Sequence, residues 1–200
     1  MARRLASGLF AAVALTVAAS GCGGKSHPKP QPVSFRGGTI VNPPRAPDFA
    51  LRDQSGRLVG LSSFAGKLRI VTFLYTHCPD VCPLIASNLN QALRNLGPKR
   101  SDVRVLAISV DPRGDTAAAV RRYVKERHLL PEFRYLRGSA GQLRPVWASY
   151  NVASDPDRTD RAVSHSAFEI LIDRRGRERL FYDAKVKAGD VVHDVRLLLR

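Results

Sequence analysis

The chain has 200 residues, of which 44% are hydrophobic, and a formal net charge of +15, with arginine supplying 25 of its 32 basic residues. The hydrophobic content is enough for a packed core, which excludes a disordered chain, and the length allows one ordinary domain with additional segments. The basic residues are scattered without a run of five or six, so the sequence argues against nucleic-acid binding and we expect no nucleic-acid partner.

Residues 1–21 have the pattern of a signal peptide. Arg3 and Arg4 precede an apolar stretch at residues 5–19 that is too short for a membrane span. Small residues then lead to Cys22, as in a bacterial lipobox, where the cysteine carries the lipid and becomes the mature N-terminus. An ordinary signal peptide followed by an unmodified cysteine is the alternative. The lipobox pattern predicts a cell-membrane lipoprotein whose domain lies on the extracytoplasmic face.

Residues 22–46 separate this segment from the domain. They are rich in proline and glycine and hold few large apolar side chains, so they cannot bury enough surface to fold. We interpret them as a semi-rigid tether and expect the globular domain over residues 47–200. The domain begins with alternating apolar residues around the polar turn Asp53–Gly56, a pattern typical of a β-hairpin.

Buried strands and helices alternate along the rest of the chain. Apolar runs rich in β-branched residues predict strands at residues 68–75, 103–110, 133–136 and 167–172. Apolar residues at helical spacing predict helices at residues 84–96, 115–124, 140–150 and 191–199. Asp115 is expected to cap the second of these helices, and Pro145 to interrupt the third.

The order of these elements predicts the fold. Strands that alternate with helices form βαβ units and a mainly parallel central sheet. A short turn at residues 173–176 leads to a last strand at residues 179–182, so the final two strands must be antiparallel. A βαβ half followed by a ββα half is the thioredoxin arrangement. We therefore expect an α/β, thioredoxin-like fold with a central mixed sheet flanked by helices and an N-terminal β-hairpin.

The stretch YTHCPDVCP, residues 75–83, joins the first central strand to the following helix. Ligand sites of open α/β sheets lie at this edge, and the positive end of a helix dipole favours the thiolate form of a cysteine. Cys78 and Cys82 are four positions apart, so one helical turn would place both sulfurs on the same side. Two such thiolates suit Cu(I) or can close into a redox-active disulfide. A plain structural disulfide is the alternative.

His165 is the strongest candidate for a third ligand. It lies just before the strand at residues 167–172, in the loop that faces the cysteine helix in a thioredoxin-like domain. His77 adjoins Cys78, but neighbouring side chains of a strand point to opposite faces. We interpret His27 as solvated and His128 and His193 as structural.

Together these residues resemble the Sco/SenC family. The resemblance rests on residues 75–83, on Ser109–Pro112 with Asp115 and Thr116, and on His165–Ser166 with Leu171–Asp173 and Gly176. It implies a thioredoxin-like fold with copper bound by Cys78, Cys82 and His165. It also implies outer groups at Asp80 and Asp111. In this sequence Gly114 stands where the family usually has a larger residue, Ala117 replaces a common proline, and Ser164 replaces a common aspartate.

The function implied by the resemblance is a membrane-tethered copper metallochaperone rather than an enzyme. It would carry Cu(I), or Cu(II) when extra ligands are present. It would deliver copper to the binuclear copper site of cytochrome c oxidase. The implied partners are the copper-bearing subunit of the oxidase, other copper chaperones, and the membrane through the lipid anchor.

A thiol–disulfide reductase that uses the same cysteines without a metal is the alternative function. Reductases of the thioredoxin type normally have a C-x-x-C pair and a cis-proline opposite it, whereas here the spacing is longer and the facing loop offers His165. A peroxiredoxin is a third candidate, but the second cysteine one turn away and the lack of arginine within Val163–Ser166 argue against it. The chaperone and reductase roles can coexist, because loading a target with copper requires reduced thiols.

Overall fold

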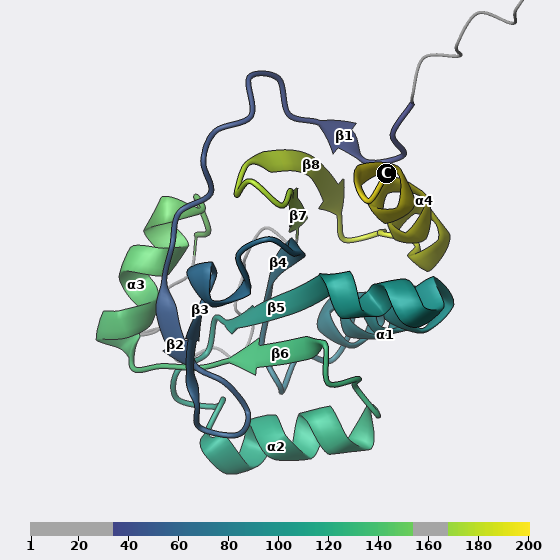
Figure 1. Ribbon diagram of the computed structural model, residues 1–200. Helices are drawn as coiled ribbons and strands as arrows, with labels where there is room; N and C mark the ends of the chain where they lie inside the picture. Colours follow the sequence, from purple (N-terminus) through teal and green to yellow (C-terminus); the bar gives the residue numbers. More distant parts are fainter. Residues whose placement is uncertain (1–33, 154–167) are drawn as a thin grey trace, which may run out of the picture. The chain divides into compact units, whose positions relative to one another are not determined.

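The computed structural model describes residues 34–153 and 168–200. A six-stranded mixed sheet has the strand order β1-β8-β7-β4-β5-β6, and β2 and β3 form a separate hairpin (Figure 1). The strands are β1 (Gly38–Thr39), β2 (Ala50–Arg52), β3 (Leu58–Gly60), β4 (Leu68–Leu74), β5 (Val103–Ser109), β6 (Phe133–Leu136), β7 (Phe168–Ile172) and β8 (Glu178–Asp183). The helices are α1 (Val81–Leu96), α2 (Ala117–Glu126), α3 (Ala140–Ser149) and α4 (Ala188–Leu198), with 3₁₀ turns η1 (Ser62–Phe64) and η2 (Gly97–Asp102). The expected mixed sheet with flanking helices and an N-terminal hairpin is confirmed.

Strand β4 is the centre of the sheet, and all seven of its residues are buried. It pairs with β5 in parallel and with β7 in antiparallel orientation, and Thr72 lies opposite Glu169. The hairpin of β7 and β8 is antiparallel, as its short turn requires. Because β4 and β7 run in opposite directions, β7 begins at the edge where β4 ends.

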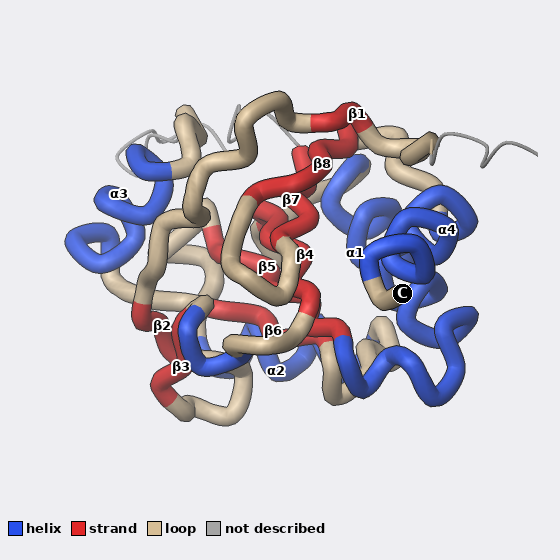
Figure 2. Tube along the Cα trace, turned by 45° about the horizontal axis from the view of Figure 1, so that its top comes forward, coloured by secondary structure: helices blue, strands red, loops and turns tan. Residues whose placement is uncertain are grey.

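Helices cover both faces of the sheet. Helices α1 and α4 lie together on one side and α3 lies on the other, as the two views agree (Figures 1 and 2). On the α3 side, the ring of Phe73 packs against Tyr150 with 5.7 Å between ring centroids. Helix α2 lies beside β6, where Tyr123 and Tyr135 pack edge to face at 5.5 Å. This packing leaves the C-terminal ends of β4 and β5 to carry the loops of the candidate site.

Three details of the helices differ from the sequence prediction. Thr116, not Asp115, caps α2, and its hydroxyl oxygen accepts a hydrogen bond from the N–H of Ala119 at 3.2 Å. Pro145 does not interrupt α3, because the carbonyl that loses its helical partner belongs to the exposed Gly141, where water can replace the bond. Leu84, expected on the apolar face of α1, is 52% exposed rather than part of the buried face.

The end of the predicted tether belongs to the domain. The structure describes this segment from residue 34 onward, and β1 within it pairs with β8. The backbone N–H groups of Arg36 and Gly37 donate to the buried carboxylate of Asp194 at 2.9 and 2.8 Å. A side chain 157 positions along the chain from Gly37 supplies this anchor, so composition alone does not predict it. Within the ranges that the structure describes, no helix is both long enough and apolar enough to cross a membrane.

Glu169 places an ionisable carboxyl group inside the sheet. Its side chain is fully buried, Oε1 accepts a hydrogen bond from the Thr72 hydroxyl at 3.3 Å, and Oε2 has no hydrogen-bond partner among the residues that the structure describes. Burial raises the pKa of Glu169 to about 8, because the single Thr72 bond compensates little of the lost hydration, and the charge of Asp183 raises it further.

We predict that Glu169 makes the free energy of unfolding fall between about pH 4.5 and pH 8. In that interval the folded protein keeps a proton that the unfolded chain has released, so each rise in pH favours unfolding. Glu169→Gln removes this titration and should flatten the decline, which is on the order of a few kcal/mol. Urea unfolding near pH 5 and near pH 8 measures it, with the exposed Glu126→Gln as the matched control. Equal declines in wild type and Glu169→Gln would contradict the prediction.

Candidate metal centre

The two cysteines lie where the chain leaves β4 and enters α1. The N–H of Cys78 donates to the carbonyl of Tyr75 at 3.3 Å and closes a turn after the strand. Cys82 is in the first turn of α1, followed by Pro83, whose missing N–H costs little at this position. Cys78 is 8% exposed, Cys82 is completely buried, and the two cysteines form no disulfide in the part of the chain that the structure describes. The expected placement of the pair at a helix N-terminus is therefore what the structure shows.

The two thiols contact each other and have different environments. The backbone N–H of Cys82 donates to Sγ of Cys78 at 3.3 Å. Burial acts to raise the pKa of Cys78, but hydrogen bonds from the Cys82 thiol, from the N–H of Asp80 and from the Tyr75 hydroxyl outweigh it and lower that pKa. Burial and the thiol bond to Cys78 raise the pKa of Cys82. Of the two, Cys78 is therefore the thiol that loses its proton more readily, and Cys82 is the one that keeps it longer.

Asp115 fixes the loop that carries the cysteines. Its carboxylate is 2% exposed and accepts hydrogen bonds from the N–H of Thr76 at 2.8 Å, the hydroxyl of Ser109 at 2.6 Å and the hydroxyl of Tyr135 at 2.9 Å. Burial raises the pKa of Asp115, although these three donors oppose the shift. Asp115, which was predicted to cap a helix, therefore joins the cysteine loop to the ends of β5 and β6.

His77 and Asp111 lie beside the cysteine loop. The ligating atoms of His77, Asp111 and Asp115 all lie within 4.8 Å of one another. Residues 75–80 are not in a strand, so the alternation of strand side chains does not determine the direction of His77. Asp115 already accepts three hydrogen bonds. His77 and Asp111 are therefore the residues of this group that could bind a metal ion.

Gly114 allows this approach of His77 and Asp111. A Cβ atom at position 114 would collide with Oδ2 of Asp111 and lie 3.0 Å from Nδ1 of His77. Asp111 in turn shapes the loop, because its Oδ1 accepts the N–H of Gly114 at 2.8 Å and the N–H of Arg113 at 3.2 Å. Glycine at position 114 is therefore required for steric reasons, which the sequence alone did not predict.

Of the remaining predicted site residues, one is exposed and two lie outside the described residues. The carboxylate of Asp80 is exposed and makes no capping bond at the start of α1. Its contact with the site is through its backbone N–H, which donates to Cys78. Cys22 and His165 lie outside the described residues.

Comparisons with known proteins identify the relatives of this chain. A family model described as SCO1/SenC matches residues 39–200. A SCO2-like protein of Rickettsia prowazekii is 30% identical over 149 residues, which are 72% of each chain. The mitochondrial SCO2 homolog of Bos taurus is 36% identical over 156 residues, or 74% of this chain and 58% of that protein. This chain therefore spans less than two thirds of the bovine relative.

A solved structure of a relative supports the fold of this chain and shows copper bound to that relative. The copper-bound structure of ScoI from Bradyrhizobium japonicum matches with a TM-score of 0.69 and 31% sequence identity, over 78% of this chain and 99% of that one. The thioredoxin-like class expected from the sequence is thereby confirmed, and the copper in that structure belongs to ScoI.

We predict that Cys78 reacts faster than Cys82 with iodoacetamide in the reduced, metal-free protein. Cys78 is more exposed and its pKa is lowered, whereas Cys82 is buried and its pKa is raised. The difference in rate should be at least about tenfold, since thiolate is the reactive form. Mass spectrometry of quenched samples assigns the modified cysteine. Tyr75→Phe should slow the modification of Cys78 by removing one donor, and faster labelling of Cys82 would overturn the assignment.

Proposed function

The chain belongs to the SCO1/SenC family, and from this premise we propose that it is a membrane-tethered copper metallochaperone. It binds one copper ion through Cys78, Cys82 and His165 and delivers it to the binuclear copper site of cytochrome c oxidase. The observation that carries the proposal is the placement of both cysteines at the start of α1, where the backbone N–H of Cys82 donates to Sγ of Cys78 at 3.3 Å. Two adjacent soft donors at the edge of an α/β sheet form a site suited to Cu(I).

The unequal thiols suit reversible copper binding. The Cys78 thiolate is the first ligand, because its pKa is already lowered in the metal-free protein. Cys82 must release its proton to become the second ligand, so copper binding releases at least one proton. Acid reverses that step and favours release of the metal. Because Cys82 is completely buried, it is shielded from solvent until copper displaces its proton.

The register of the sheet supports His165 as the third ligand. Glu169 pairs with Thr72, so β7 begins at the same edge of the sheet at which β4 ends and the cysteine loop starts. His165 precedes Phe168, the first residue of β7, by three positions. A neutral imidazole completes a three-coordinate Cu(I) site. Cu(II) would need additional nitrogen or oxygen donors, for which His77 and Asp111 on the neighbouring loops are the candidates.

The relatives support the cargo and the recipient. ScoI, which is 31% identical, is a copper-bound protein in its solved structure. The recipient follows from the family resemblance, which implies assembly of cytochrome c oxidase. A lipid at Cys22, followed by the proline-rich segment, would hold the domain at the extracytoplasmic face, where its partners are the copper-bearing oxidase subunit and other copper chaperones.

One observation favours an accessory thiol–disulfide role. Cys78 has the features of an attacking thiol, namely a lowered pKa and some exposure, and Cys82 has those of a buried resolving thiol. The same pair can reduce a disulfide of a target by forming a Cys78–Cys82 disulfide, with two electrons passing to the target. We propose this as a second function that prepares the target cysteines for copper.

We predict that the copper-loaded chain holds one copper ion and that His165→Ala separates the two functions. Loss of the imidazole leaves the ion under-coordinated, so copper retention against a chelator should fall by at least about tenfold. Disulfide exchange should persist, because it requires only the thiols. Copper content, exchange with a model disulfide, and oxidase activity in cells that carry only the variant are the measurements.

The control is His128→Asn, because asparagine tolerates the positive φ of 48° at this exposed position. Cys78→Ser and Cys82→Ser should each abolish tight copper binding. Normal copper retention and oxidase assembly in His165→Ala would reject the proposed ligand set and favour the reductase as the main function. Wild-type copper affinity in Cys78→Ser would reject the site altogether.

A separate prediction concerns the tether. Cys22→Ser removes the lipid attachment point, so the variant should leave the membrane fraction or accumulate unprocessed. Fractionation and intact mass of the protein from exporting cells provide the test. Membrane association and mass processing identical to wild type would mean that Cys22 carries no lipid.

A further inference from the structure

Arg69 carries a buried positive charge that has no ion-pair partner. It is the only buried basic side chain among the described residues, with 3% exposed. Its guanidinium donates to three backbone carbonyls, those of Phe64 at 3.0 Å, Lys67 at 2.8 Å and Asp173 at 2.8 Å. Its Nε has no hydrogen-bond partner, and Arg69 forms no ion pair in the part of the chain that is described. Neutral carbonyls orient this charge but do not compensate it.

The two carboxylates that influence Arg69 make their close contacts elsewhere. Asp173 accepts the N–H groups of Arg175 and Arg177 at 2.9 Å each and pairs with Arg179 at 3.4 Å. Asp48 accepts the N–H of Phe49 at 2.8 Å and the N–H of Ser62 at 3.1 Å. Both carboxylates therefore interact with Arg69 only by longer-range electrostatic attraction. The guanidinium group can still bind another anion.

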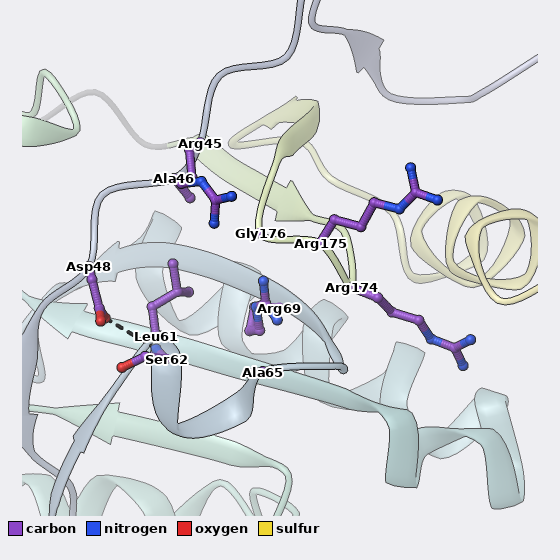
Figure 3. A pocket seen from close by; sticks show the side chains of 10 residues that line it. All are labelled: Arg45, Ala46, Asp48, Leu61, Ser62, Ala65, Arg69, Arg174, Arg175 and Gly176. Carbon is purple, nitrogen blue, oxygen red and sulfur yellow. Dashed lines mark hydrogen bonds between the residues drawn. The ribbon is translucent and has the colours of Figure 1, made fainter.

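A cavity of about 230 Å³ lies next to Arg69. Its basic residues are Arg45, Arg69, Arg174 and Arg175, and Asp48 is the single acid among the residues that line it. Figure 3 shows Asp48 and Ser62 on one side of this cavity and Arg174 and Arg175 extending from the turn on the other. The cavity is smaller than the ~300–1,000 Å³ of sites for drug-sized ligands, so it suits a small group.

The backbone holds the walls of this cavity together. The N–H of Ala46 donates to the carbonyl of Gly176 at 2.9 Å and fixes the segment that carries Arg45 against the β7–β8 turn. Arg69 binds the same turn through the carbonyl of Asp173. The cavity is at the start of β4, whereas the cysteine loop follows the end of β4. The two sites are therefore at opposite edges of the sheet.

We propose that this cavity binds a phosphate group, either free or in a lipid headgroup. Guanidinium groups bind phosphate oxygens in paired, charge-assisted hydrogen bonds, and Arg45, Arg174 and Arg175 line the cavity with Arg69. The anion compensates the buried charge of Arg69. A headgroup bound here would turn the cysteine edge away from the membrane surface, toward a partner. The proposal is independent of copper binding.

The test uses full-length chains in the copper-free state. Arg45→Gln combined with Arg175→Gln removes two cavity arginines, and the exposed pair Arg121→Gln with Arg122→Gln on α2 is the control with the same loss of charge. Both cavity positions are exposed, so folding should be preserved, unlike with a change at buried Arg69. Calorimetric titrations use inorganic phosphate and acetate. Flotation uses phosphatidylcholine vesicles with and without phosphatidic acid, and every variant keeps the same N-terminal segment.

We expect wild type and the control pair to bind phosphate at one saturable site, and the cavity pair to bind it at least about tenfold more weakly. Stronger flotation of wild type and control than of the cavity pair on phosphatidic acid identifies the headgroup as the source. Equal flotation with preserved phosphate binding identifies free phosphate. Equal weakening in both double variants, binding to neither phosphate nor vesicles, or equal affinity for acetate would overturn the proposal.

Discussion

The site depends on one buried carboxylate. Asp115 joins the N–H of Thr76 to the hydroxyls of Ser109 and Tyr135, so the loop after β4 is held to the ends of β5 and β6. Three donors compensate the burial of this carboxyl group, which would otherwise be costly. Because Cys78 follows Thr76 by two residues, the position of the first thiol relative to the sheet is set by this network rather than by the cysteines themselves.

Fixing the loop gives the two thiols their different properties. Cys78 receives donors from the start of α1 and from Tyr75, which lower its pKa, whereas Cys82 is buried in the core and its pKa is raised. The neighbouring polar groups depend on the same loop geometry, since a side chain at position 114 would collide with Asp111 and crowd His77. One local structure therefore gives two adjacent thiols unequal acidity and places an imidazole and a carboxylate on the same loops.

The sequence predicted the elements that have a strong local signal. The apolar runs of β4 and β5, the hairpin and the placement of Cys78 and Cys82 all follow from periodicity and from residue types that act within a few positions. Interactions between distant segments were not predictable in this way. Three hydrogen bonds illustrate this, because each joins residues far apart in sequence. They are the bonds from Gly37 to Asp194, from Tyr135 to Asp115 and from Arg69 to Asp173. Asp115 was misassigned because an aspartate before a helix usually acts as its cap.

The proposed function requires that two sulfurs and one imidazole hold the copper ion. X-ray absorption at the copper edge, recorded on the copper(I)-loaded full-length protein, measures the ligands directly. We expect a three-coordinate ion with two sulfur scatterers and one nitrogen scatterer, with the nitrogen lost in His165→Ala. A spectrum without sulfur, or one that is unchanged in His165→Ala, would contradict it.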